Sequence, residues 1–149
     1  MVVAAVLAVG ISMGLFSGSR PETLGARDGR LAPCKRTPNC VSSQADAGKD
    51  AGHYIAPIRI TGSGRVVWEA LKSLLQSMPR VSIVADKENY LHAEFTSRSM
   101  GFVDDVEFLL DEKAGVMHVR SASRLGVRDF GVNRDRIETI RSRMAVAIK

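Results

Sequence analysis

The chain has 149 residues, of which 45% are hydrophobic and 25% charged, and its formal net charge at pH 7 is +5. This length suits one folded domain, and the composition excludes a disordered chain or a coiled coil. The excess positive charge lies in the C-terminal part, where eight basic and three acidic residues fall between Arg120 and Lys149. Few aromatic residues lie near these arginines, so nucleic-acid binding through stacked bases is not expected.

The first nineteen residues carry no charged side chain and predict a targeting or membrane segment. As a helix, Val2–Ser19 would be about 27 Å long, close to the ~30 Å thickness of the hydrocarbon core. We interpret residues 1–19 as a signal peptide, cut after the small residues at 17–19, or as a short uncleaved membrane anchor. Because no basic residue precedes the apolar run, we expect the true start of the protein to lie upstream. Both interpretations predict a protein of the cell envelope, exported to the periplasm or tethered to the membrane.

Residues 20–33 show no hydrophobic periodicity and are predicted to be a flexible linker. They lead into the only two cysteines of the chain, Cys34 and Cys40. The Pro38-Asn39 pair between them predicts a turn, and an even cysteine count in an exported protein favours a disulfide. Free structural thiols and redox or metal chemistry remain as alternatives, although the spacing is not that of C-x-x-C catalysts and a zinc site takes four ligands.

A single α+β domain is predicted over residues 34–149. A short edge strand at 55–60 precedes a helix at 64–77, whose apolar residues follow one helical stripe. This helix is expected to end before Pro79. The last helix is predicted to begin after an N-cap at Asn133.

Four strands between the two helices are indicated by alternation of apolar and polar residues. Their predicted ranges are 80–86, 90–98, 104–111 and 116–124. Short connections make these four strands an antiparallel meander. The element order β-α-β-β-β-β-α therefore predicts a two-layer α+β sandwich, an antiparallel sheet with two helices on one face.

The same alternation gathers charged side chains on the sheet face that the helices leave open. They are His92, Glu94, Arg98, Asp105, Glu107, His118, Arg120 and Arg124. The simplest interpretation is a solvated face on which acids and arginines pair across neighbouring strands.

A second interpretation is a site for an anion where the last strand leads into the last helix. Arg124, Asp129, Asn133 and Arg134 are expected to converge there, with Arg98 and Arg120 on the adjoining face. Arginine forks and a helix N-terminus together suit a carboxylate or a phosphate. A third interpretation is a small metal-dependent enzyme that uses the acidic strand Asp104, Asp105 and Glu107 with His92 or His118. This spacing matches no known ligand motif, so neither a metal, a cofactor nor catalysis is expected.

Two stretches resemble motifs of a known family, the domain of unknown function 1499. The stretch CKRTPNCVSSQA, which begins at Cys34, resembles its opening motif, and SRLGVRDFGVNRDRIETIR, which begins at Ser123, resembles its second motif. The resemblance covers Leu31–Met144 and implies a small α+β domain associated with an envelope or thylakoid membrane. The family has no established activity, so the resemblance implies no ligand.

These observations predict a non-catalytic binding module of the cell envelope, joined to the membrane through its N-terminal segment. Its expected partner is an anionic small molecule, a lipid headgroup or an envelope protein. The metal-dependent enzyme and a purely structural domain remain the alternatives.

Overall fold

A computed structural model of the protein describes residues 16–147. Most of the predicted leader, residues 1–19, therefore lies outside the described residues. Within the described part of the chain, no helix has both the length and the apolar character needed to cross a membrane.

In the described residues, six strands form one antiparallel sheet. They are β1 (Cys40–Ser42), β2 (Ile58–Arg59), β3 (Val81–Asp86), β4 (Tyr90–Thr96), β5 (Val103–Asp111) and β6 (Val116–Ser123). The order β6-β5-β4-β3 is the predicted meander, and β1 and β2 pair with opposite halves of β6. The four long strands lie within two residues of their predicted bounds, because each alternates apolar and polar residues on a pleated backbone.

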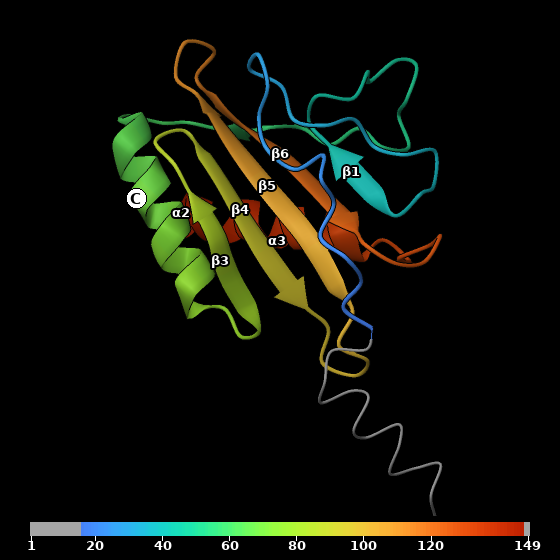
Figure 1. Cartoon of the computed structure of the whole chain (residues 1–149). Helices are drawn as coiled ribbons and strands as arrows, with labels where there is room; N and C mark the ends of the chain where they lie inside the picture. Colours follow the sequence, from blue (N-terminus) through green and yellow to red (C-terminus); the bar gives the residue numbers. More distant parts are fainter. Residues whose placement is uncertain (1–15, 148–149) are drawn as a thin grey trace, which may run out of the picture.

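Two helices cover one face of the sheet, which confirms the predicted α+β sandwich (Figure 1). Helix α2 (Gly64–Ser77) has its predicted bounds and packs a stripe of apolar residues into the core. Helix α3 (Val132–Ala147) buries Ile137, Ile140 and Met144 against the same core. The members of this core from the sheet include Leu91, Val106, Phe108, Met117 and Val119.

The opposite face of the sheet is covered by the segment that the sequence predicts to be a flexible linker (Figure 1). We call residues 20–33 the strap. Arg20 pairs with Glu94 of β4 at 2.6 Å, and the Gly25 N–H donates to Glu107 of β5 at 2.9 Å. Leu31 packs in a small apolar cluster with side chains of β4 and β5. The strap has no sequence periodicity because it is held by single backbone and side-chain bonds rather than by a regular ladder.

Two short strands differ from prediction. The sequence does not predict β1, whose three residues are all buried where it pairs with β6. The predicted strand at 55–60 shortens to β2, because Pro57 has no N–H to donate to a ladder. Segments this short carry too little alternation to be recognised in a sequence.

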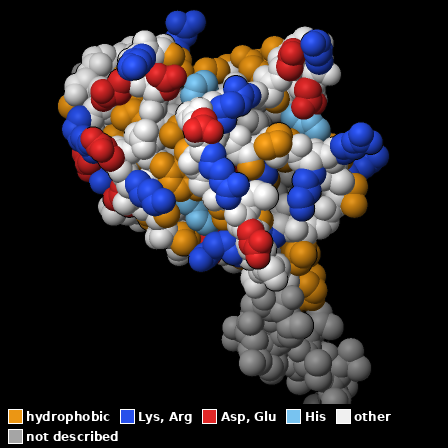
Figure 2. All heavy atoms as spheres, turned by 45° about the horizontal axis from the view of Figure 1, so that its top comes forward, with side chains coloured by type: hydrophobic (Ala, Val, Ile, Leu, Met, Phe, Trp, Pro, Cys, Tyr) orange, Lys and Arg blue, Asp and Glu red, His pale blue; other side chains and the backbone are white. Residues whose placement is uncertain are grey.

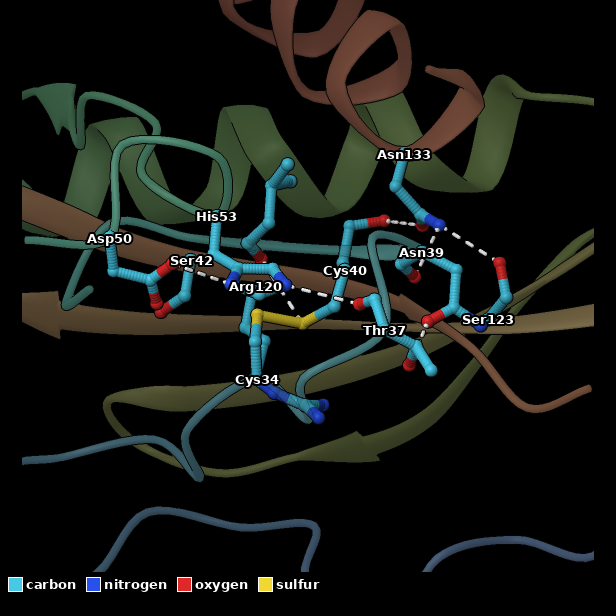
Figure 3. The surroundings of a disulfide bond; sticks show 12 residues. Cys34, Thr37, Asn39, Cys40, Ser42, Asp50, His53, Arg120, Ser123 and Asn133 are labelled. Atoms are coloured by element: carbon cyan, nitrogen blue, oxygen red, sulfur yellow. Dashed lines mark hydrogen bonds and ion pairs between the residues drawn. A yellow bond between two sulfur atoms is a disulfide. The ribbon is translucent and has the colours of Figure 1, made fainter. Parts of the chain in front are cut away.

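The predicted disulfide between Cys34 and Cys40 is present, with the two sulfurs 2.02 Å apart and the Cα atoms 5.7 Å apart (Figure 3). Cys40 begins β1, so the bond fastens the end of the strap to the sheet. His53 lies beside this loop and contacts the Asp50 carboxylate at 2.7 Å and the Thr37 carbonyl at 3.1 Å. Burial lowers the pKa of His53, but these two acceptors outweigh burial and raise it above its ordinary value.

Removal of the disulfide by Cys34→Ala with Cys40→Ala is expected to lower the free energy of unfolding by about 2 kcal/mol, the loop-closure entropy of so short a loop. Urea unfolding measures this loss. Thiol titration of the denatured, unreduced protein is expected to find no free thiol, and two free thiols would refute the bond.

Candidate functional site

The charged sheet face is buried, not solvated as the sequence suggests. His92, Asp105, Glu107 and Arg120 are each no more than 6% exposed. The strap covers them, and the charges that it covers are paired with one another. The predicted cross-strand pairing of acids with arginines is therefore correct, whereas the predicted exposure of this face is wrong.

Arg124 lies at the centre of the largest group of these charges. Its guanidinium donates to both Asp105 oxygens, at 2.8 and 2.7 Å, and to Glu94 at 2.5 Å. His92 contacts the same Asp105 carboxylate at 2.8 Å. Arg20 of the strap approaches Glu94 from outside and closes the group.

The pKa shifts in this group show that hydrogen bonds stabilise the charged forms of its side chains. Burial alone would raise the pKa of Asp105, but hydrogen bonds from Arg124 and His92 outweigh burial and lower it. The pKa of Glu94 is lowered in the same way by Arg124 and Arg20, against the effect of its burial. The bonds to Asp105 raise the pKa of Arg124 still further above its already high ordinary value. The folded protein therefore favours the charged form of all three groups.

A second group of charges lies next along the same face. Arg120 donates to the fully buried Glu107 carboxylate at 3.1 Å. The hydroxyl of Tyr90 donates to the other oxygen of Glu107 at 2.8 Å, as does the Gly25 N–H of the strap. Burial, and next the charge of Glu107, raise the pKa of Tyr90 above its ordinary value.

The predicted convergence of four residues at the start of the last helix is only partly correct. Asp129 and Asn133 do contact each other, at 2.7 and 2.8 Å. Arg134 instead donates to the backbone carbonyls of Gly52 and Tyr54, while Arg124 is bound to the sheet carboxylates. The two arginines that were expected to share an anion are thus each bound to another part of the protein.

Asn133 is not the N-cap of the last helix. It is fully buried inside α3, and Asp129 accepts from the N–H groups of Gly131 and Asn133 at the helix start. Burial raises the pKa of Asp129, but its hydrogen bonds from Asn133 outweigh burial and lower it. An N-cap motif can be shifted by a few residues in a sequence that offers both Asp and Asn, because both side chains can cap.

The buried Asn133 joins the two stretches that carry the family resemblance (Figure 3). Its side-chain amide lies 3.1 Å from the Asn39 carbonyl and 2.9 Å from Ser123. The Asn39 side chain in turn donates to the carbonyl of Gly126 at 2.7 Å. The cysteine loop and the loop before α3 are therefore fixed to each other through two asparagines.

The acidic strand does not present its three carboxylates to one point. Asp104 points to the helix side of the sheet, where it accepts from Arg136 at 2.6 Å, because neighbouring residues of a strand face opposite ways. Of the two histidines, His118 contacts Ser43 at 3.2 Å. The residues of the predicted metal-dependent enzyme site are therefore divided between the two faces of the sheet.

A cluster with the geometry of a metal site is formed by His92, Glu94 and Asp105, whose ligand atoms lie within 4.8 Å of one another. The guanidinium of Arg124 already binds both carboxylates of this cluster. A metal ion would have to displace the Arg124 guanidinium, so we interpret the cluster as an ion-pair network.

A small cavity of about 40 Å³ lies where the strap, the cysteine loop and β6 meet. The polar residues that line it include Thr23, Lys35, Asn39, Asp105, Arg120 and Arg124. The side chain of Arg120 is buried beside it, and its Nε has no hydrogen-bond partner among residues 16–147. Such a buried donor normally finds an acceptor, so the cavity is the place where a ligand atom or a water would satisfy it.

Two of the predicted site residues, Arg120 and Arg124, therefore line a cavity, and Arg98 is exposed in the loop after β4. Sequence reasoning missed Lys35 and Asn39, since it treated the cysteine loop as a separate structural feature. The Pro38-Asn39 turn signal is visible in the same loop as Lys35, but nothing in the sequence indicates that this turn lies against β6.

The fold and this site define a small α+β sandwich whose second sheet face carries a buried ion-pair network beneath an N-terminal strap. The chain belongs to the family whose model is described as Protein of unknown function (DUF1499), which matches residues 30–144. No curated protein and no solved structure matches the chain.

Replacement of Arg124 by Met is expected to lower the free energy of unfolding at pH 7 by about 3 kcal/mol or more, because the buried Asp105 loses its partner. Urea unfolding measures the loss. The matched control is Arg143→Met at an exposed position of α3, for which a change within about 0.5 kcal/mol is expected. Equal small losses in the two variants would contradict the network.

The network also predicts a dependence of stability on pH. Because the folded pKa values of Asp105 and Glu94 are lowered, their contribution is complete above the ordinary carboxyl pKa of about 4. It is lost as the pH falls through the lowered values. The difference in stability between the parent protein and Arg124→Met is therefore expected to narrow below about pH 4, and a constant difference would argue against these ion pairs.

Proposed function

We propose that the protein is a non-catalytic binding module of the cell envelope that takes a small anion, a carboxylate or a phosphate, in the cavity beside Arg120. The observation that carries this proposal is the buried Arg120 Nε without a partner among the described residues. A buried donor left unsatisfied costs about 1–3 kcal/mol, and an anion is the acceptor that a guanidinium binds most strongly.

The charges around the cavity support an anion over a cation. Arg120, Arg124 and Lys35 are the basic residues of its lining, and Asp105 is the acidic one. Asp105 and Arg124 balance each other's charge. Arg120 is paired with Glu107, so the positive charge that favours an anion comes from Lys35 and from the Nε donor of Arg120, which is unused among the described residues. Lys35 is exposed at the cysteine loop and brings further positive charge to the cavity.

The location in the envelope is supported by the disulfide, since such bonds persist in oxidising compartments outside the cytoplasm. The uncharged N-terminal stretch supports export or tethering to the membrane. A phosphate in this cavity could be free or belong to a lipid headgroup, and the chemistry of recognition is the same for both.

Inorganic phosphate is expected to bind the full chain and to raise its thermal midpoint, as calorimetric titration and thermal unfolding measure. Lys35→Gln is expected to weaken phosphate binding about twofold to fivefold, the effect of an exposed charge. Arg120→Lys, which keeps the charge but removes the Nε donor, is expected to weaken it by about tenfold or more.

The matched control is Arg36→Gln, a charge change at the exposed neighbour of Lys35 that does not line the cavity. Equal losses in Lys35→Gln and Arg36→Gln would mean that phosphate responds only to overall charge, and would refute the site. Glycerol phosphate and vesicles that contain phosphatidylglycerol distinguish the two sources. Tighter binding of the vesicles than of glycerol phosphate, weakened by Arg120→Lys but not by Arg36→Gln, would assign the cavity to a lipid headgroup.

A further inference from the structure

Exposed apolar side chains gather on two loops at one end of the sheet. Leu125, Val127 and Phe130 lie in the loop between β6 and α3, and Phe102 lies in the loop between β4 and β5. The two loops are joined where the Arg124 N–H donates to the Val103 carbonyl at 3.2 Å. We call Phe102, Leu125, Val127 and Phe130 the apolar tip.

The fold itself does not account for the exposure of the tip. Phe130 is 93% exposed, and its backbone has a φ of 53°, in the left-handed region that a bulky residue rarely adopts. Its ring therefore gains nothing from packing within the domain, although its backbone is held in a costly conformation. An aromatic ring presented in this way suits a surface that receives it from outside.

The N-terminal segment enters the domain at this tip. The ring of Phe16, the first described residue, lies 5.6 Å from the ring of Phe102. Gly18 packs so closely on the β6–α3 loop that a Cβ there would lie 3.1 Å from the side chain of Leu125. Figure 2 shows apolar side chains exposed beside the place where the described chain begins. The sequence of residues 2–15, VVAAVLAVGISMGL, contains no charged residue.

Exposed arginines accompany the apolar side chains on both loops. Arg128 lies between Val127 and Phe130, and Arg98 lies in the same loop as Phe102. Apolar side chains with arginines beside them match the interface of an anionic bilayer, where rings enter the boundary of the acyl chains and cations remain with the phosphates.

We propose that the apolar tip is a membrane-docking surface that inserts into the headgroup region of an anionic bilayer. The uncharged residues 2–15 target the chain to that bilayer. The side chains of the apolar tip, Phe102, Leu125, Val127 and Phe130, then insert into its headgroup region. Arg98 and Arg128 pair with lipid phosphates. In the docked domain, the β4–β5 and β6–α3 loops lie against the membrane. The C-terminal end of α3 points away from it. This proposal is independent of the anion cavity, because it involves different residues and a different measurement.

The test places a tryptophan in the tip and measures its depth. The only native tryptophan, Trp68, is fully buried and gives a constant background. The full chain with Phe130→Trp is reconstituted in vesicles of equal parts phosphatidylcholine and phosphatidylglycerol, with and without bromine on the acyl chains. We expect the new tryptophan to shift its emission to the blue and to be quenched by the brominated lipid.

The matched control is Val146→Trp. Val146 is 74% exposed and lies near the C-terminal end of α3, about 20 Å from the tip. No shift and no quenching beyond background are expected there. Val127→Trp gives the same test of the tip if Phe130→Trp does not fold. In the variant with Arg98→Gln and Arg128→Gln, quenching at the tip is expected to fall, as it is in high salt.

Absence of quenching at both tip positions in the folded, reconstituted protein would overturn the proposal. Equal quenching at residues 130 and 146 would also overturn it, because the domain would then have no preferred face toward the membrane. A blue shift that appears without lipid and grows with protein concentration would assign the tip to a second copy of the chain instead.

Discussion

The buried carboxylates of β5 are the constraint on which this structure depends. Asp105 and Glu107 lie on the sheet face away from the helices, almost entirely out of solvent. A buried carboxylate is stable only with charged or hydrogen-bonding partners. Arg120 of β6 and Arg124, the residue directly after β6, supply these partners. From the strap, the Gly25 N–H donates to Glu107, and Arg20 pairs with the neighbouring Glu94.

The covered face explains why distant parts of the chain are fastened together. The disulfide fixes the end of the strap to β1, and β1 extends the sheet beyond β6. Asn39 and Asn133 then lock the cysteine loop to the loop before α3. These connections place the strap, the cysteine loop and β6 around one small cavity. They also place the N-terminal segment beside the loop that carries Phe130. Both proposals, the anion cavity and the docking tip, follow from this arrangement.

Much of the helix side of the fold could be predicted from the sequence, and much of the charged side could not. The apolar stripe of α2 and the alternation of the four long strands determine those elements, because local periodicity is enough to specify a buried face. The same alternation correctly placed Arg120 and Arg124 opposite acids. It could not show that the face is covered, because residues 20–33 have no periodicity to reveal what they pack on. It also could not show that Arg134 binds the backbone near Tyr54, since that contact joins residues far apart in the sequence.

Amide hydrogen exchange of the full chain tests most directly whether the strap lies against the charged face. The N–H of Gly25 donates to the buried Glu107, whereas Gly29 is an exposed glycine of the same strap. The structure predicts that Gly25 exchanges much more slowly than Gly29, and that Glu107→Gln reduces the difference. Exchange of Gly25 at the rate of Gly29 in the folded parent protein would contradict a covered sheet face, because residues 20–33 would then be the flexible linker that the sequence suggests.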